Sequence, residues 1–187
     1  KELDSSNSPD ALLMNVFCHP DTSKHRALAR LFGKEKLPRL EFGTRGRVPL
    51  GNDKPDRTRI DMQIVKVFVE AKLTEPGFTA AHKGKLSSYR DFNEVFDISA
   101  LPQHGDKYLH YQLIRNVLAA YAHDGEFFLL CDARRPDLLR SWWEVMLCIK
   151  PLDLRLRCHF VLWQEVAATV PDEGCDFLRE KYGIVHT

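Results

Sequence analysis

The chain has 187 residues, of which 44% are hydrophobic, and this composition favours a folded domain with a sizeable core over a disordered tail. Lys and Arg total 27 against 26 Asp and Glu, which gives a net charge of +1. The chain as a whole therefore has no positive field that would attract an acidic partner, and any basic surface must be local. Five widely spaced cysteines without a C-x-x-C pair argue against a disulfide framework or a zinc site.

The N-terminal part of the sequence predicts helices followed by strands. Ser8 is a suitable N-cap, and Pro9 suits the first helical position. The turn-rich stretch GNDKPD separates two short strand-like runs, and a third run is rich in β-branched and aromatic residues. The expected elements are helices over residues 8–17 and 22–33, and strands over residues 39–50, 57–65 and 66–73.

The rest of the chain alternates helices and strands after a Gly- and Pro-bounded stretch. Residues 74–107 are compatible with a mobile excursion around a short helix. The expected elements after it are helices over residues 108–123, 135–149 and 175–183, and strands over residues 126–133 and 154–163. This order predicts an α/β fold in which helices cover a mixed sheet. No run approaches the roughly 18 apolar residues of a membrane helix and no signal peptide is visible, so we expect a cytoplasmic protein without a membrane partner.

The stretch IDMQIVKVFVEAKLTE, residues 60–75, reads as a hairpin with an acid in the middle of each strand. If residues 65 and 66 form a two-residue turn, Asp61 lies directly opposite Glu70. Side chains in such a position have Cβ atoms about 4.5–5.5 Å apart, and like charges there are destabilising. Lys72 shares the face of Glu70 because side chains alternate along a strand, so a compensating cation is built in.

Two interpretations of these three residues compete. In the first, Lys72 bridges two surface acids, which would contribute about 0–1 kcal/mol. In the second, the acids hold Mg²⁺ or Mn²⁺, hard cations that prefer oxygen ligands, and Lys72 lies near an attacking water or a developing charge. Metal-assisted hydrolysis of a phosphodiester requires this set of groups. Because E-x-K tripeptides are common by chance, the spacing alone leaves both open.

A family resemblance rests on these residues and on the order of elements. Asp61, eight further residues and then Glu70-Ala71-Lys72 resemble the core of the PD-(D/E)XK nuclease superfamily, over roughly residues 10–165. More narrowly, EFGTRGRVPL, RTRIDMQI, VEAKLTE, YQLIRNVLAA and LCDARRPDL are similar to a poorly characterised bacterial restriction-endonuclease-like group. The resemblance implies one nuclease domain over residues 1–187, with a restriction-endonuclease-like mixed β-sheet flanked by helices, and DNA as substrate.

The resemblance also implies roles for single residues. Asp61 and Glu70 resemble the metal-binding acids, and the backbone carbonyl of Ala71 resembles the third protein ligand of a Mg²⁺ ion. Lys72 resembles the catalytic lysine. Gln112 is similar to the glutamine that some branches carry on the crossover helix to orient the site, although a solvated helix residue is the alternative.

One acid of the family pattern is missing from its usual place. Many members carry a further glutamate on the first helix, and neither ALLMNVF nor HRALARLF contains one. Glu41 could reach the site from the first strand and serve as a metal ligand, unless it is a simple strand-end acid or the helical acid lies upstream of Lys1. The literal Pro55-Asp56 pair is assigned to the turn, because Asp56 has the opposite strand parity to Asp61.

Several basic residues are candidates for contacts with DNA phosphates, although each alone could be a solvated charge. They are Arg45, Arg47, Arg57, Arg59, Arg134 and Arg135. Arg134 and Arg135 stand between a strand and a helix start, where backbone N–H groups also favour anions. The stretch SWWEVM is expected in the core rather than as a stacking platform for bases, because apolar positions follow Trp142 at helical spacing.

The leading hypothesis from the sequence is a Mg²⁺-dependent DNA endonuclease. The alternative is a catalytically inactive domain of the same fold that binds nucleic acid or serves in assembly. The sequence leaves open the DNA specificity, the number of metal ions, and whether the protein is a monomer or a homodimer.

Overall fold

The structure is a computed structural model that describes residues 4–20, 22–52 and 54–186. Its main sheet has the strand order β1-β2-β3-β7-β8. These strands are β1 (Leu40–Arg45), β2 (Arg59–Ile64), β3 (Val67–Ala71), β7 (Glu126–Cys131) and β8 (Cys158–Leu162). β1, β2 and β3 pair antiparallel, whereas β3, β7 and β8 pair parallel. The sheet is therefore mixed, which confirms the predicted α/β class.

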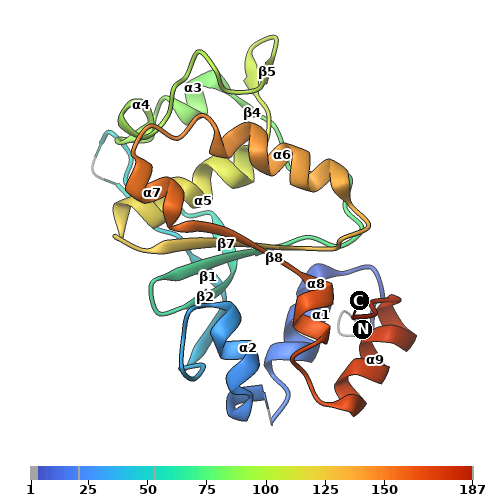
Figure 1. Ribbon diagram of the computed structural model, residues 1–187. Coiled ribbons are helices and arrows are strands. Elements are labelled where there is room, and N and C mark those ends of the chain that lie inside the picture. Colours follow the sequence, from blue (N-terminus) through green and yellow to red (C-terminus); the bar gives the residue numbers. More distant parts are fainter. Residues whose placement is uncertain (1–3, 21, 53, 187) are drawn as a thin grey trace.

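Helices cover both faces of this sheet (Figure 1). One face carries α3 (Lys83–Leu86), α4 (Phe92–Val95), α5 (Tyr111–Ala122), α6 (Pro136–Met146) and α7 (Leu152–Leu156). The other carries α1 (Pro9–Phe17), the 3₁₀ turn η1 (Thr22–Lys24), α2 (Arg26–Leu31), α8 (Trp163–Ala167) and α9 (Asp172–Tyr182). Helix α5 connects β3 to β7, and α6 and α7 connect β7 to β8. Such helical crossovers are what allow neighbouring strands to run parallel.

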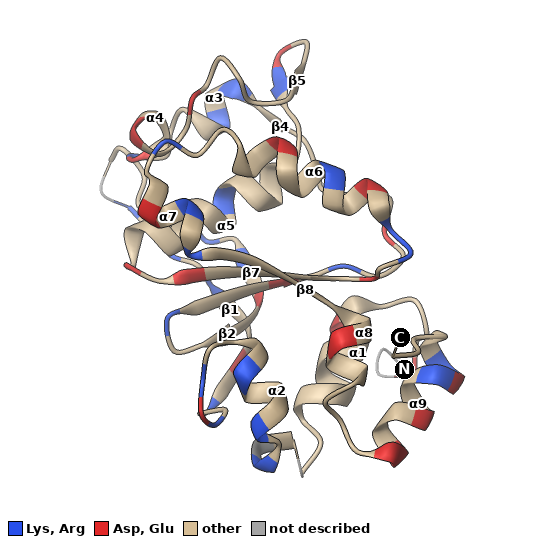
Figure 2. Cartoon of the chain, viewed as in Figure 1, with Lys and Arg blue, Asp and Glu red and all other residues tan. Residues whose placement is uncertain are grey.

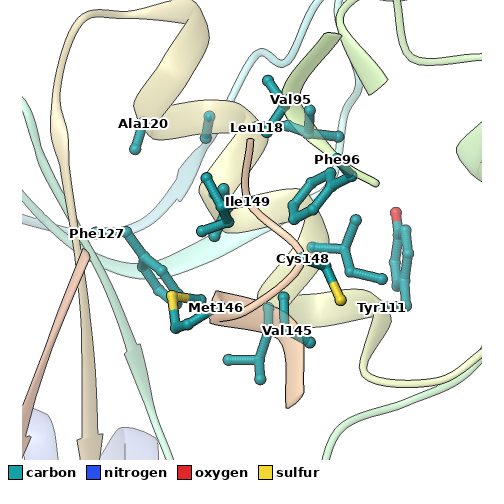
Figure 3. Packing of buried hydrophobic residues seen from close by; sticks show 14 of the residues in the cluster. Val95, Phe96, Tyr111, Leu118, Ala120, Phe127, Val145, Met146, Cys148 and Ile149 are labelled. Carbon is teal, nitrogen blue, oxygen red and sulfur yellow. The ribbon is translucent and has the colours of Figure 1, made fainter. Parts of the chain in front are cut away.

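Each face of the sheet has its own apolar core. Phe127 on β7 packs against Trp142 of α6 with ring centroids 5.5 Å apart, in the core on the α5 side that Figure 3 shows from close by. Its neighbour Phe128 packs against Phe32 at 5.2 Å, in the core on the α1 side. Because successive side chains of a strand point to opposite faces, β7 is buried on both sides.

Strand β2 turns over near Asp61. Met62 and Ile64 lie in the α1-side core, but Ile60 lies in the α5-side core. Regular alternation would place all three on one face, so the strand rotates between Ile60 and Met62. On β1 the facing residue is Gly43, whose φ is +59°, and the ladder register passes from Phe42–Met62 to Thr44–Ile60 without a pair at this point. Glycine is suited to this position because its missing Cβ permits a positive φ.

The segment over residues 74–107 has more structure than its sequence predicted. It holds a small sheet of three two-residue strands, which are β4 (Ala81–His82), β5 (Gln103–His104) and β6 (Lys107–Tyr108). Apolar side chains of the segment, including Phe92 and Phe96, are buried in the α5-side core. The segment therefore forms part of the α5-side layer, and the interpretation as a simple excursion is corrected.

The strand predicted over residues 154–163 is also corrected. It begins only at Cys158, because residues 154–156 complete α7, and it ends at Leu162 because Trp163 starts α8. The last helix begins at Asp172 rather than residue 175 and ends before Gly183, whose φ of +63° provides a left-handed C-cap. Among the residues described, no helix is both long and apolar enough to cross a lipid bilayer.

Candidate active site

Asp61 lies where the pairing of β2 with β3 ends. The register joins Ile64 to Val67 and Met62 to Val69, which confirms the two-residue turn predicted from the sequence. One step further, Asp61 Oδ2 accepts a hydrogen bond of 2.8 Å from the backbone N–H of Ala71. The carboxylate thus takes the place of a backbone partner and points along the sheet toward β3.

The backbone carbonyl of Ala71 lies on the same side of β3 as Asp61. The N–H of the next residue, Lys72, donates to the Leu130 carbonyl on β7 at 2.8 Å. Backbone groups of consecutive strand residues point to opposite neighbours, so the N–H and C=O of Ala71 both point toward β2. The Asp61 carboxylate and the Ala71 carbonyl therefore lie on the same side of β3, at the end of the ladder.

Glu70 is 1% exposed and is held by four donors. Gln112 Nε2 donates to Oε1 at 2.7 Å, and Asn116 Nδ2 donates to Oε2 at 2.8 Å. Lys72 Nζ lies 3.2 Å from Oε1, and Arg115 Nη2 lies 3.5 Å from Oε2. A buried carboxylate remains ionised only when such partners replace its hydration. Helix α5, which carries Gln112, Arg115 and Asn116, thus fixes this acid.

Lys72 is also almost fully enclosed. Its ammonium lies 3.2 Å from Glu70 Oε1 and 3.7 Å from Glu75 Oε1, and 5.6 Å from the centroid of the Phe78 ring. The Lys72 carbonyl accepts a hydrogen bond of 3.0 Å from Trp163 Nε1, which anchors the backbone at the end of β3. The interpretation of Lys72 as part of an exposed surface ion pair does not fit this burial.

The surroundings of Asp61 favour the protonated form of its carboxyl group. Burial raises the pKa of Asp61 to about 8, with further upward pressure from the charges of Glu70 and Asp10, while the Ala71 hydrogen bond and Lys72 act in the opposite direction. Two acids that repel each other, one of them fully buried and the other only partly exposed, form a place that a divalent cation would stabilise. Within the described part of the chain, no three His, Cys, Asp or Glu side chains gather as a complete metal site. The donors present are two carboxylates and the Ala71 carbonyl, all hard oxygen atoms.

Comparison with known proteins gives one result for the whole chain. A family model described as Restriction Endonuclease associating with ARP matches residues 1–183. The chain belongs to this family. Comparisons with curated proteins and with solved structures give no match. Membership agrees with the resemblance to restriction endonucleases found in the sequence, and it classes the chain with nucleases.

In this member of the restriction endonuclease family, the sequence reasoning missed Asp10. Asp10 lies in the first turn of α1 and, together with Asp61 and Gly43, lines a hollow of about 340 Å³. Its charge acts on Asp61. The family pattern predicts an acid on the first helix, and Asp10 directly precedes the stretch ALLMNVF, which contains none.

Glu41 takes a different position from the one expected. It is exposed and pairs with Gln63 across β1 and β2. It lines a separate hollow with Gln63 and Lys66 rather than the hollow of Asp61. Asp10, not Glu41, is therefore the acid that accompanies Asp61.

Asp56 lies in the connection before β2, as predicted. Its carboxylate accepts hydrogen bonds from the Thr58 N–H at 3.1 Å, the Thr58 hydroxyl at 2.6 Å and the Tyr89 hydroxyl at 2.8 Å. Burial alone would raise the pKa of Asp56, but these hydrogen bonds outweigh it and the net shift is downward. Asp56 therefore stabilises the connection.

The basic residues chosen from the sequence fall into two kinds. Arg134 forms hydrogen bonds to both oxygens of the buried Asp132, and Arg135 forms a two-point pair with Asp137 at 2.9 and 2.7 Å. These arginines stabilise the connection between β7 and α6, and neighbouring acids neutralise their charges. Arg59 differs, because it lines the hollow of Asp61.

Proposed function

We propose that the chain is a Mg²⁺-dependent DNA endonuclease that hydrolyses phosphodiester bonds. The observation that carries this proposal is the hydrogen bond from the Ala71 N–H to Asp61 at the end of the β2–β3 ladder, next to Glu70, whose carboxylate lies 3.2 Å from the Lys72 ammonium. Membership of a restriction endonuclease family supports the class of reaction. The metal and the residue roles are our assignment.

Asp61, Glu70 and the Ala71 carbonyl would hold Mg²⁺ or Mn²⁺ through oxygen atoms. When bound, such an ion would offset the negative charge of the transition state and lower the pKa of a bound water. Lys72 would place a positive charge beside the attacked phosphate and stabilise charge as it develops there. Gln112, which donates to Glu70 at 2.7 Å, would keep this carboxylate oriented.

Asp10 would assist from α1. Its position in the same hollow as Asp61 suits an acid that contacts the ion through water, since Mg²⁺ usually retains several waters. We therefore assign to Asp10 the third acidic position that the sequence gave to Glu41.

The test is cleavage of supercoiled plasmid DNA. Nicked and linear products should form with Mg²⁺ or Mn²⁺ and disappear in EDTA, and the Glu70→Gln variant should not cut. Glu35→Gln, at an exposed position, is the matched control and should cut at the parental rate. Cleavage that persists in chelator would exclude the mechanism.

A second candidate function is a non-catalytic role in assembly. The family description names an association with ARP, and α6 and α7 expose large apolar side chains, including Trp143 at 53%, Leu147 at 70% and Leu156 at 68%. This role would need neither Lys72 nor a metal ion. It would be favoured if the pure protein left plasmid DNA intact with both Mg²⁺ and Mn²⁺.

A further inference from the structure

The connection from β1 to β2 carries a basic surface that the overall charge conceals. Residues 45–59 contain five cations and two acids, a net charge of +3 against +1 for the whole chain. The cations are Arg45, Arg47, Lys54, Arg57 and Arg59. The rest of the chain is therefore slightly acidic, although Lys and Arg also lie on other elements, such as α2 and α3 (Figure 2).

The four arginines of this connection differ from Arg134 and Arg135 in their partners. Arg45, Arg47, Arg57 and Arg59 are all exposed, and no ion pair to any of them is found within residues 4–20, 22–52 and 54–186. We refer to these four residues as the arginine row. The one described acid of the connection, Asp56, is already bound by Thr58 and Tyr89.

Two members of the row oppose each other directly. Arg45 pairs with Arg59 across the β1–β2 ladder. Side chains in this relation have Cβ atoms about 4.5–5.5 Å apart, and two like charges there destabilise the sheet. An anion between them would remove the repulsion, and phosphate oxygens match the planar donors of guanidinium groups. The arrangement thus favours a bound phosphate.

The row begins at the candidate active site. Arg59 lines the hollow that contains Asp61. Arg45 and Arg47 line a second hollow, of about 700 Å³, with Lys66 on its wall. Both also line a third hollow with Arg57. Each of these three hollows therefore has at least one cation of the connection in its lining.

We propose that the arginine row binds the phosphodiester backbone of the nucleic acid on one side of the scissile bond. This inference rests on the proposed function, because it delivers the same substrate to Asp61 and Glu70. It assigns the electrostatic contact to the β1–β2 connection and leaves Arg134 and Arg135 as residues that stabilise the fold.

The test is the salt dependence of DNA binding, measured by fluorescence anisotropy with a labelled duplex in EDTA, so that no cleavage occurs. Each phosphate contact contributes about 0.9 to the slope of log affinity against log salt. The double variant Arg45→Gln/Arg59→Gln should therefore lower the slope by about 2, whereas Arg45→Lys/Arg59→Lys should keep it, because the charges remain. The matched control is Arg26→Gln/Arg30→Gln, which removes two exposed arginines from α2 and should leave the slope unchanged.

An unchanged slope in Arg45→Gln/Arg59→Gln, or an equal fall in the α2 control, would overturn the inference. Thermal unfolding of the free protein accompanies the binding assay, and we expect the Gln variant to unfold at or above the parental temperature because a like-charge pair is removed. The two proposals fail separately. An arginine-dependent slope without cleavage would refute the endonuclease proposal and support the arginine row. Cleavage with an unaltered slope would support the endonuclease proposal and refute the arginine row.

Discussion

Replacement of Asp61 by Asn should stabilise the metal-free protein while it abolishes cleavage. Asn keeps an oxygen that can accept the Ala71 N–H and removes a carboxylate whose pKa is raised to about 8 by burial and by the charge of Glu70. Because the folded-state pKa lies above the unfolded value of about 3.9, this acid costs nothing below pH 3.9, and stability falls as the pH rises from there through about 8.

The size of this stability gain follows from the interval between the unfolded-state pKa of about 3.9 and the pH of the measurement. At pH 7 the cost spans about three pH units at about 1.4 kcal/mol each, or about 4 kcal/mol. Water reaches the partly exposed Asp61 side chain, and such screening reduces the cost to about 2 kcal/mol. For a domain of this size, that corresponds to a rise in Tm of about 4–8 °C.

Urea unfolding in EDTA, followed by circular dichroism at pH 4.5 and pH 7, measures the difference. The Asp61→Asn variant should gain about 2 kcal/mol over the parent at pH 7 and about 0.5 kcal/mol at pH 4.5. The control Glu35→Gln should stay within about 0.5 kcal/mol of the parent at both. A gain that is equal at the two pH values, or a loss at pH 7, would refute the reasoning.

Further predictions concern the groups around Asp61. Lys72→Met should lower the cleavage rate by a factor of about 10²–10³ and leave DNA affinity in EDTA nearly unchanged, as measured by single-turnover kinetics and anisotropy; a parental rate would contradict it. Asn116→Leu should lower the free energy of unfolding in urea by about 2–4 kcal/mol, because Glu70 and Arg115 each lose a buried partner; a loss below about 0.5 kcal/mol would show that the network is dispensable. Because Asp61 is largely protonated at pH 7, Mg²⁺ binding there should release close to one proton; calorimetry in buffers of different ionisation enthalpy measures this, and no release would be inconsistent with the raised pKa.

The hairpin register could be predicted from the sequence because strand periodicity and turn length determine it. The pairing of Ile64 with Val67 and of Met62 with Val69 follows directly from a two-residue turn. The hydrogen bond from Gln112 to Glu70 involves the glutamine that the family resemblance singles out on the crossover helix. Strong local patterns and one specific motif therefore place most of the site.

Other features depend on packing between distant segments. Asn116 and Arg115 contact Glu70 from 46 and 45 positions away along the chain, and no local pattern indicates that α5 turns these side chains toward β3. The turnover of β2 at Asp61 depends on Gly43 of the neighbouring strand. The partners of Arg134 and Arg135 follow from side-chain geometry, so the sequence could not distinguish these two residues from the arginines of the β1–β2 connection, for which no ion pair is found among the described residues.

The rotation of β2 near Asp61 also connects the α5-side core with the α1-side core. Ile60 anchors the hairpin in one core, and Met62 anchors it in the other. Glu70 is oriented by α5, whereas Asp61 borders α1. A chain in which only one layer had folded would present a single correctly placed acid and could not assemble the pair. A centre that needs both acids would therefore become competent only when both layers of the domain have folded.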